Sequence, residues 1–327
     1  MRIHRSTLLM AIIFIVSVLY IILYFKLFIP SAEQEQNIAV ILKEHNIRSD
    51  FWQTVSAGAE AAAKESGAHI TITGPLQETD AEAQLALLED ILQQSPQAIV
   101  VAPINDDRIT AELKKIQDAD IPLVIIDTPF SLNSPPPFVS NDHMAAGIQA
   151  GRTTATETNG LPKAVIISDS ITSGVSIERE KGIRKSLLPY KQSIYGTFYS
   201  SDSEERSFLI AKESMNEHPD LNAIIALNES SALGAAKAIK EANRTGLVKL
   251  IGFDTSMYEI RLLEEGTLNA TVVQQPFNIG YLGVQTGLNI IKGKTVNPVT
   301  YTNSIVVTKD NMYSPENQKL LFPFIEK

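Results

Sequence analysis

Short apolar segments alternate with longer amphipathic segments along most of this chain. The apolar segments hold four or five consecutive Val, Ile, Leu or Ala residues, which is typical of parallel strands buried on both faces. The segments between them carry apolar residues at helical spacing. The pattern therefore predicts an α/β fold with parallel sheets covered by helices.

The first half of the pattern predicts four strands, at residues 38–42, 69–73, 98–102 and 123–127, with helices at 51–66, 79–94 and 106–119 between them. Gly67 is expected to cap the first of these helices at its C-terminus. Thr79 with Glu82 has the spacing of a capping box for the second helix. Asp106 and its neighbours are interpreted as a helix N-cap, because they lack the spacing of a calcium loop.

A proline-rich stretch at 132–137 interrupts the alternation, which then resumes. Nine or ten strands are many for one sheet, so we expect two Rossmann-like lobes with a ligand cleft between them. The further expected strands are 138–140, 164–168, 195–198, 223–226, 249–253 and 270–273, and the further helices are 142–156, 177–188, 204–217, 230–242 and 257–265.

Four of the apolar runs end at a polar side chain: Asp127, Asn228, Asp254 and Gln274. Ligands of open α/β sheets bind beyond the carboxyl ends of the strands, so these residues are candidates for one small-molecule site. Carboxylates and amides form directional hydrogen bonds with sugar hydroxyls. Each residue taken alone is equally compatible with a turn or a helix cap.

Phe51, Trp52 and Arg179 are further candidates. The aromatic pair opens the first helix near the end of the first strand, where its rings either pack in the core or stack on a sugar ring. Arg179 follows the loop 170–176 at the start of a helix, and it is either solvated or directed into the cleft.

The N-terminal residues 1–30 contain an apolar run from Leu8 to Phe25, preceded by Arg2 and Arg5. About 20 apolar residues span a bilayer. We interpret the run as an uncleaved transmembrane helix with a cytoplasmic N-terminus, although cleavage of a signal segment after Ala32 is the alternative. Residues 31–36 form a linker, and the protein is expected at the cell membrane as a single-pass protein with its sugar-binding region extracytoplasmic.

Composition and motifs exclude several classes of protein. The net charge of −9 over 327 residues argues against nucleic acid as a partner. The absence of cysteine excludes disulfides and a lipidated cysteine. We find no nucleophile elbow, phosphate-binding loop or metal-binding histidine pair. We therefore expect no catalytic residue, no cofactor and no metal, and a binding protein rather than an enzyme.

From about residue 38 to residue 307 the chain resembles the ribose-type periplasmic sugar-binding proteins, whose fold, periplasmic binding protein type I, is shared with the effector domains of LacI-type repressors. The matching segments include IAVILK, DFWQTVSAG, PLVIIDT, VSNDHMAAG, ALNESSALGA, IGFDT and ATVVQQP. An apolar N-terminus in place of a helix-turn-helix argues against a repressor. The resemblance implies lobes of 37–140 plus 275–300 and of 141–274 plus 301–327, with hinges near Asn141, Gln275 and Tyr301.

The resemblance also implies that Phe51 and Trp52 sandwich a monosaccharide ring while Asp127, Arg179, Asn228, Asp254 and Gln274 bind its hydroxyls. Three positions depart from the family. Lys43 stands where a small polar residue is usual, Thr128 replaces an arginine, and Asp202 or a neighbour replaces an aromatic residue. Lys43 and Thr128 are included among the ligand-binding candidates, and the departures argue for a sugar other than ribose.

The apolar N-terminal run is a departure that bears on the partner. An uncleaved anchor resembles binding proteins that act beside a sensor histidine kinase, and signalling to such a kinase is the expected function. The alternative is delivery of the sugar to the permease of an ABC transporter.

Overall fold

The computed structural model describes residues 10, 13–21, 36–47, 49–190 and 194–321. The chain divides into two units, Met1–Gln36 and Asn37–Lys327. In the first unit the described residues 13–21 are helical. Within the described residues no helix has both the length and the apolarity to cross a membrane. Eight of the eighteen residues of the expected anchor, Leu8 to Phe25, lie outside the described residues.

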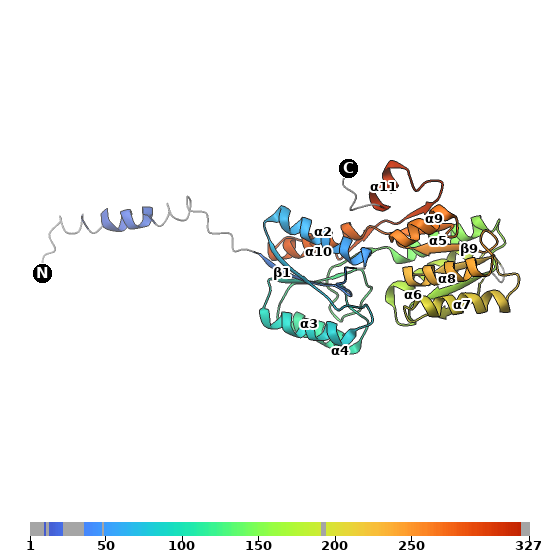
Figure 1. Cartoon of the computed structure of the whole chain (residues 1–327). Helices are drawn as coiled ribbons and strands as arrows, with labels where there is room; N and C mark the ends of the chain where they lie inside the picture. Colours follow the sequence, from blue (N-terminus) through green and yellow to red (C-terminus); the bar gives the residue numbers. More distant parts are fainter. Residues whose placement is uncertain (1–9, 11–12, 22–35, 48, 191–193, 322–327) are drawn as a thin grey trace. The chain divides into compact units, whose positions relative to one another are not determined.

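The second unit contains two six-stranded sheets, which define two lobes (Figure 1). The first lobe has the strand order β11-β5-β4-β3-β1-β2. All its strand pairs are parallel. Its strands are β1 (Asn37–Ile41), β2 (His69–Thr73), β3 (Ala98–Val101), β4 (Leu123–Ile126), β5 (Phe138–Asn141) and β11 (Val299–Thr302), and its helices are α2 (Asp50–Ser66), α3 (Ala81–Gln94), α4 (Asp107–Asp118) and α10 (Pro276–Ile291).

The second lobe has the order β12-β10-β9-β8-β6-β7, in which the β10–β12 pair is antiparallel. Its strands are β6 (Ala164–Ser168), β7 (Ile194–Tyr199), β8 (Ala223–Ala226), β9 (Lys249–Phe253), β10 (Ala270–Val273) and β12 (Ile305–Thr308). Its helices are α5 (His143–Glu157), α6 (Gly174–Leu187), α7 (Glu204–Glu217), α8 (Glu229–Glu241) and α9 (Met257–Glu265), and the short α11 (Pro315–Leu321) follows β12.

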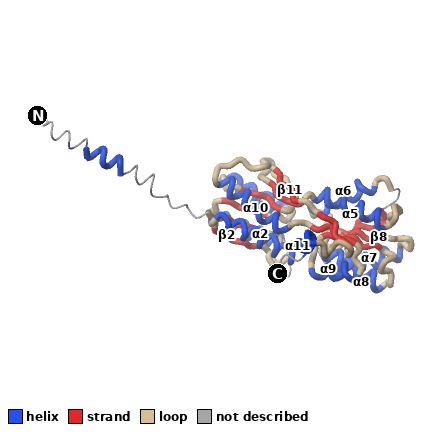
Figure 2. Tube along the Cα trace, turned by 90° about the horizontal axis from the view of Figure 1, so that it is seen from above, coloured by secondary structure: helices blue, strands red, loops and turns tan. Residues whose placement is uncertain are grey.

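Helices cover both faces of each sheet. The first sheet lies between α2 and α10 on one side and α3 and α4 on the other (Figure 1), and the second lies between α5 and α6 on one side and α7, α8 and α9 on the other (Figure 2). In β1, Val40 packs in the core beneath α2 and α10, whereas the next residue, Ile41, packs in the core beneath α3 and α4. Successive strand side chains point to opposite faces of a sheet. A strand with apolar residues at every position is therefore buried on both sides, as the continuous apolar runs predict.

Close contact between α2 and α10 depends on glycine. A Cβ atom added to Gly280 would lie 1.9 Å from the carbonyl oxygen of Val55, and one added to Gly58 would lie 1.9 Å from that of Phe277. The two backbones therefore touch, and the helix that follows the second lobe is held in the first.

The chain passes between the sheets three times: from β5 into α5, from β10 into α10, and from β11 to β12. Because α10 and β11 belong to the first sheet, each lobe is made from separate parts of the sequence. The carboxyl ends of β4, β8 and β9 carry Asp127, Asn228 and Asp254, and the fold brings these ends to one place.

The expected α/β alternation is confirmed, with some differences in detail. Gly67 caps α2 with φ of 69°, and the Asp106 side chain accepts a hydrogen bond from the Arg108 amide at 2.8 Å, as expected. The capping box at Thr79 is wrong, because Asp80 is the N-cap residue and accepts from the Ala83 amide. The elements α10, β11, β12 and α11 were not predicted from the sequence.

Candidate functional site

A cavity of about 1030 Å³ lies between the carboxyl ends of the two sheets. Its volume is at the upper end of the range for ligand pockets, about 300–1,000 Å³. All nine residues selected from the sequence line it: Lys43, Phe51, Trp52, Asp127, Thr128, Arg179, Asn228, Asp254 and Gln274. The structure thus brings the nine together, and their contact with a ligand stays a prediction.

Asp127 and Asp254 follow β4 and β9 directly, and both have a positive φ, 61° and 82°. A positive φ is uncommon outside glycine, although Asp tolerates it better than most residues. Hydrogen bonds hold each backbone: the carbonyl of Asp127 accepts from the Ser140 hydroxyl at 2.6 Å, and that of Asp254 accepts from the Thr271 hydroxyl at 2.7 Å. The two turns thereby direct both carboxylates into the cleft.

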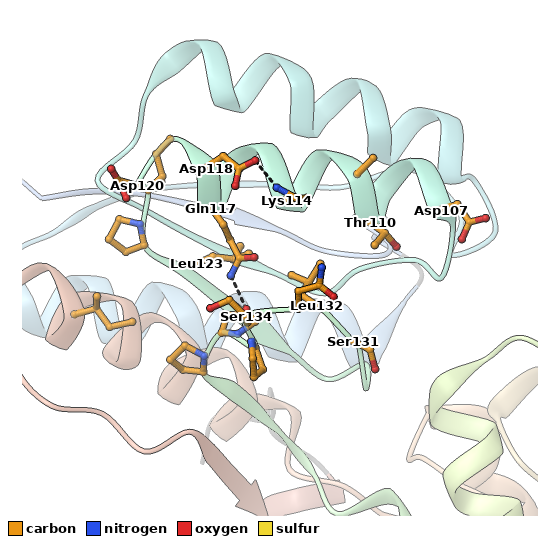
Figure 3. A pocket seen from close by; sticks show the side chains of 18 residues that line it. Asp107, Thr110, Lys114, Gln117, Asp118, Asp120, Leu123, Ser131, Leu132 and Ser134 are labelled. Carbon is orange, nitrogen blue, oxygen red and sulfur yellow. Dashed lines mark hydrogen bonds and ion pairs between the residues drawn. The ribbon is translucent and has the colours of Figure 1, made fainter.

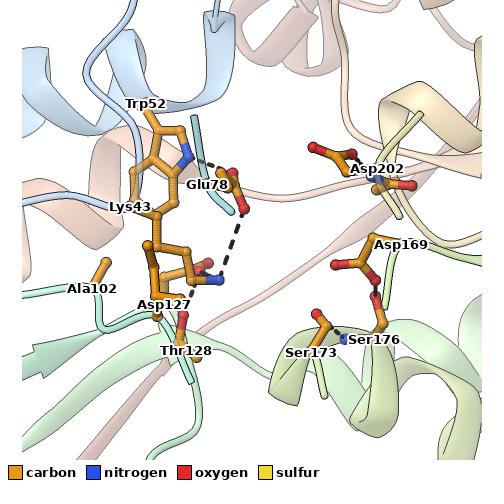
Figure 4. Close-up of polar contacts among 12 residues, drawn as sticks. Lys43, Trp52, Glu78, Ala102, Asp127, Thr128, Asp169, Ser173, Ser176 and Asp202 are labelled. Atoms are coloured by element: carbon orange, nitrogen blue, oxygen red, sulfur yellow. Dashed lines mark hydrogen bonds and ion pairs between the residues drawn. The ribbon is translucent and has the colours of Figure 1, made fainter. Parts of the chain in front are cut away.

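Lys43 lies at the end of β1 with its side chain 11% exposed. Its Nζ is 3.7 Å from Asp127 Oδ2 and 3.9 Å from Glu78 Oε2 (Figure 4). The Thr128 hydroxyl donates to the same Asp127 oxygen at 3.2 Å. The distances from Lys43 are longer than a direct hydrogen bond, so its ammonium is attracted by two carboxylates and still has donors for a ligand.

In the second lobe, Arg179 of α6 is buried beside the strand ends. Its Nη1 donates to the carbonyl of Leu227 at 2.5 Å, its guanidinium lies 4.3 Å from the ring centre of Phe253, and its Nη2 is 4.0 Å from Asp254 Oδ1. Gln274 Nε2 donates to Asp254 Oδ1 at 2.6 Å. Burial raises the pKa of Asp254, and Arg179 and Gln274 oppose that rise.

Asn228 is both a helix cap and a cleft residue. Its Oδ1 accepts from the Ser231 amide at 3.3 Å, which caps α8, while its Nδ2 donates to Asp202 Oδ1 at 2.7 Å. The Ser230 hydroxyl donates to the same Asp202 oxygen at 2.5 Å. Asn228 can therefore cap α8 and also belong to a small-molecule site, the two alternatives that its sequence position leaves open.

The aromatic pair differs from the expected sandwich. The rings of Phe51 and Trp52 meet edge to face at 90°, with centres 4.9 Å apart, which leaves no room for a sugar ring between them. Adjacent residues of a helix point about 100° apart, so they cannot form parallel walls. Trp52 is 1% exposed, and its Nε1 donates to Glu78 Oε1 at 2.5 Å. Phe51 is half-buried and lines the cavity.

Three acidic residues that were not predicted from the sequence also line the cavity: Glu78, Asp169 and Glu229. Asp169 directly follows β6, so the strand-end rule applied to that strand finds it. Glu78 lies five residues beyond the end of β2 and gave no such signal. Burial in the cleft raises the pKa of Glu78 to about 7, even though 38% of its side chain is exposed to the cavity. Burial likewise raises the pKa of Glu229 to about 7.

A second hollow, of about 770 Å³, lies in the first lobe between α4 and the proline-rich loop (Figure 3). Lys114 and Asp118 form an ion pair at 2.6 Å there, and Gln117 donates to the carbonyl of Ser134. Its walls are helix and loop side chains that pair with one another. The interlobe cavity is therefore the better candidate for ligand binding.

The described residues contain no group of three or more histidine, cysteine or acidic side chains that could hold a metal ion. Within the cleft, Lys43 lies beside Asp127 and Arg179 lies beside Asp254. The arrangement can bind a polar molecule through charged and amide groups from both lobes.

The chain is similar to known proteins in both sequence and fold. Residues 38–295 match the periplasmic binding protein domain. The D-ribose/D-allose-binding protein of Pseudomonas aeruginosa is 28% identical over 270 residues, which cover 80% of this chain and 84% of that protein. Similar solved structures include GanP, a glucose-galactose binding protein from Geobacillus stearothermophilus, with 30% identity, a TM-score of 0.82, and coverage of 86% of this chain and 100% of that one. An ABC transporter solute-binding protein from Agrobacterium vitis with bound D-fucose has 31% identity, a TM-score of 0.81, and coverage of 87% and 99%.

Proposed function

Because the chain belongs to the periplasmic binding protein family, we propose that it binds a monosaccharide outside the cytoplasm and delivers it to the permease of an ABC transporter. The relatives are binding proteins rather than enzymes, and so is this chain. The observation that carries the proposal is the meeting of all nine candidate residues on the wall of one interlobe cavity. The similar protein solved with bound D-fucose supports a sugar as the ligand.

Unpaired polar atoms in the cleft support the same function. Arg179 Nε and Gln274 Oε1 are buried and have no hydrogen-bond partner. A buried polar group without a partner costs about 1–3 kcal/mol. A sugar hydroxyl is both donor and acceptor, so it can pair with either atom when a shift of the side chain turns that atom towards the cavity. The free energy of satisfying them then contributes to ligand affinity.

The transporter is favoured over the sensor histidine kinase as partner. The similar Agrobacterium vitis protein is an ABC solute-binding protein, whereas no comparison supports signalling to a kinase. A pull-down from membranes with the sugar-loaded protein tests this choice. Recovery of a permease supports delivery, and recovery of a kinase without a permease contradicts it.

A membrane tether is a separate proposal that rests on the sequence. The run from Leu8 to Phe25 is long enough to span a bilayer, and the chain has no cysteine for a lipid anchor. Mass spectrometry of the protein purified from membranes should find residues 1–30 present. A mature N-terminus near Glu33 in a water-soluble fraction would instead show cleavage.

Trp52 provides the direct test of sugar binding. It is the single tryptophan of the chain, and it lines the cavity. Its fluorescence should change saturably when residues 37–327, which form one compact unit, are titrated with a panel of monosaccharides. Calorimetry on the same samples gives an independent affinity. If neither fluorescence nor calorimetry detects binding of any sugar, the proposed function is wrong.

A further inference from the structure

Two carboxylates of the second lobe face the cleft without a cationic partner. Asp169 accepts a hydrogen bond from the Ser176 hydroxyl at 2.5 Å. Asp202 accepts from Asn228 Nδ2 at 2.7 Å and from the Ser230 hydroxyl at 2.5 Å. All these donors are neutral. Among the described residues, no Lys, Arg or His nitrogen lies within 4.0 Å of either carboxylate.

The first lobe adds further negative charge across the cleft. Figure 4 shows Lys43, Glu78 and Asp127 on one side of the gap and Asp169 and Asp202 on the other. The Lys43 ammonium already lies 3.7 Å from Asp127 and 3.9 Å from Glu78. Two other cations of the described residues line the cavity: Arg179 lies on the Asp254 side, 4.0 Å from that carboxylate, and Lys319 belongs to α11. In the part of the cleft shown in Figure 4, one ammonium, that of Lys43, therefore faces the four carboxyl groups of Glu78, Asp127, Asp169 and Asp202.

Closure of the cleft around a ligand makes this excess charge costly, because it removes water from the carboxylates. A buried charge is expensive unless it is paired and hydrogen-bonded. In the cleft, burial raises the pKa of Asp202 and the charge of Asp169 adds to the rise, although hydrogen bonds from Ser230 and Asn228 and the charge of Lys43 oppose it. A sugar hydroxyl donates a hydrogen bond to a carboxylate but leaves its charge. An ammonium group both donates a hydrogen bond to the carboxylate and compensates its charge.

We propose that the cleft recognises a monosaccharide carrying a protonated amino group, which lies between Glu78 of the first lobe and Asp169 and Asp202 of the second. The inference rests on the proposed function, and it names the class of sugar. An independent observation indicates where the rest of the ring binds. Arg179 and Gln274 line the same cavity beside Asp254, and their Nε and Oε1 atoms are buried and unpaired, so this part of the cavity offers polar groups for the ring hydroxyls.

Calorimetry with matched sugars tests the inference. Glucosamine and galactosamine are compared at pH 7 with glucose, galactose and the two N-acetyl derivatives, which keep the ring but lack the charge. We expect the free amines to bind at least tenfold more tightly than the neutral parents, in line with the strength of charge-assisted hydrogen bonds. Equal or tighter binding of the neutral sugars would overturn the inference and leave the proposed function intact. No binding of any sugar would contradict both.

The substitution Asp202→Asn locates the amino group. Asn also tolerates the backbone φ of 56° at this position, and it retains an oxygen for Asn228 and Ser230. The ratio of amine to neutral-sugar affinity should fall at least tenfold. Glu213→Gln, at an exposed position of α7, removes the same charge outside the cleft and should leave the ratio unchanged. An unchanged ratio in Asp202→Asn would show that the amine does not bind there.

Discussion

Asp127 and Asp254 occupy equivalent positions in the two lobes, one residue after a central strand. Both adopt the left-handed backbone conformation, which costs about 1–3 kcal/mol for a residue with a side chain. Such strain persists where the surrounding structure holds the backbone in place. Here hydrogen bonds from Ser140 and Thr271 to the two aspartate carbonyls hold it. At the residue scale, the sequence identified these aspartates, but it did not indicate how their backbones aim the carboxylates.

The substitution Asp254→Ala should abolish binding of any sugar that the wild type binds, because it removes the acceptor held by Gln274 and the charge beside Arg179. The loss of a charged hydrogen-bonding group corresponds to at least a hundredfold rise in Kd, about 3 kcal/mol. Asp254→Asn keeps an acceptor and should retain part of the affinity. Calorimetry measures the loss, and circular dichroism checks that the fold persists. Retained affinity in Asp254→Ala would show that the cleft assignment is wrong.

His143 provides a pH prediction. Burial, helped by the charge of Arg179, lowers its pKa from 6.5 to about 4, and its Nε2 lies 2.8 Å from the Asp127 carbonyl. Above pH 6.5 the ring is neutral in both folded and unfolded chains. As the pH falls from 6.5 towards 4, the unfolded chain binds a proton that the folded chain does not. Folding stability is therefore lost in that window, by about 2 kcal/mol at pH 5.

Denaturant unfolding of wild type and His143→Asn at pH 7.5 and pH 5 isolates this effect. Asn can still donate a hydrogen bond, but it does not titrate. The difference in unfolding free energy between the two proteins should shift by about 2 kcal/mol in favour of the variant at pH 5. Other titrating groups, such as Glu78 and Glu229, are common to both proteins and cancel in the difference. A constant difference would mean that the ring does not stay neutral in the folded state.

At the scale of elements, α2 and α10 pack through Gly58 and Gly280 although more than 200 residues separate them. Helix α10 was not predicted, because the segment begins with a proline, is rich in glycine and follows the second lobe in the sequence. Its neighbours in space, rather than its own propensity, account for its stability. The predicted capping box at Thr79 is wrong for a local reason: Asp80 lies one residue later and is an equally good N-cap residue.

Gly280→Ala should destabilise the protein, because the new Cβ would lie 1.9 Å from the Val55 carbonyl and would force α2 and α10 apart. We expect a loss of about 1–3 kcal/mol or more, measured by denaturant unfolding. Gly287→Ala on the same helix is the control. Its Cβ would meet the nearest atom, the Ala98 Cβ, at 3.5 Å, and it should be tolerated. Equal stability of the two variants would contradict the close packing of the helices.

At the scale of the whole molecule, the lobes also touch at the rim of the cleft. Asn105 Nδ2 of the first lobe donates to the carbonyl of Thr172 in the second at 2.9 Å. Close by, a Cβ added to Gly174 would lie 3.1 Å from the Pro129 carbonyl oxygen. The segment 105–107 was interpreted only as a helix cap, and Asp106 does cap α4. Its neighbour Asn105 has a second role, which no local pattern indicates.

Asn105→Ala should weaken sugar binding by disfavouring the arrangement in which the lobes touch. One hydrogen bond contributes about 0.5–1.5 kcal/mol, so Kd should rise about two- to tenfold. Calorimetry measures the change. Asn133→Ala, at an exposed position of the same lobe, is the control and should bind as the wild type does. An unchanged Kd in Asn105→Ala would show that the contact does not contribute to binding.

The sequence by itself determined the alternation of strands and helices, because continuous apolar runs and helical spacing record burial residue by residue. Applied to β4, β8, β9 and β10, the strand-end rule also selected Asp127, Asn228, Asp254 and Gln274. Only the tertiary structure decided that residues 276–291, expected in the first lobe, form the helix α10 that packs on α2, that Phe51 and Trp52 meet edge to face, and that Glu78 joins Lys43 in the cleft. These features depend on contacts between residues far apart in the chain or on the direction of side chains, and neither is recorded in local patterns of polarity.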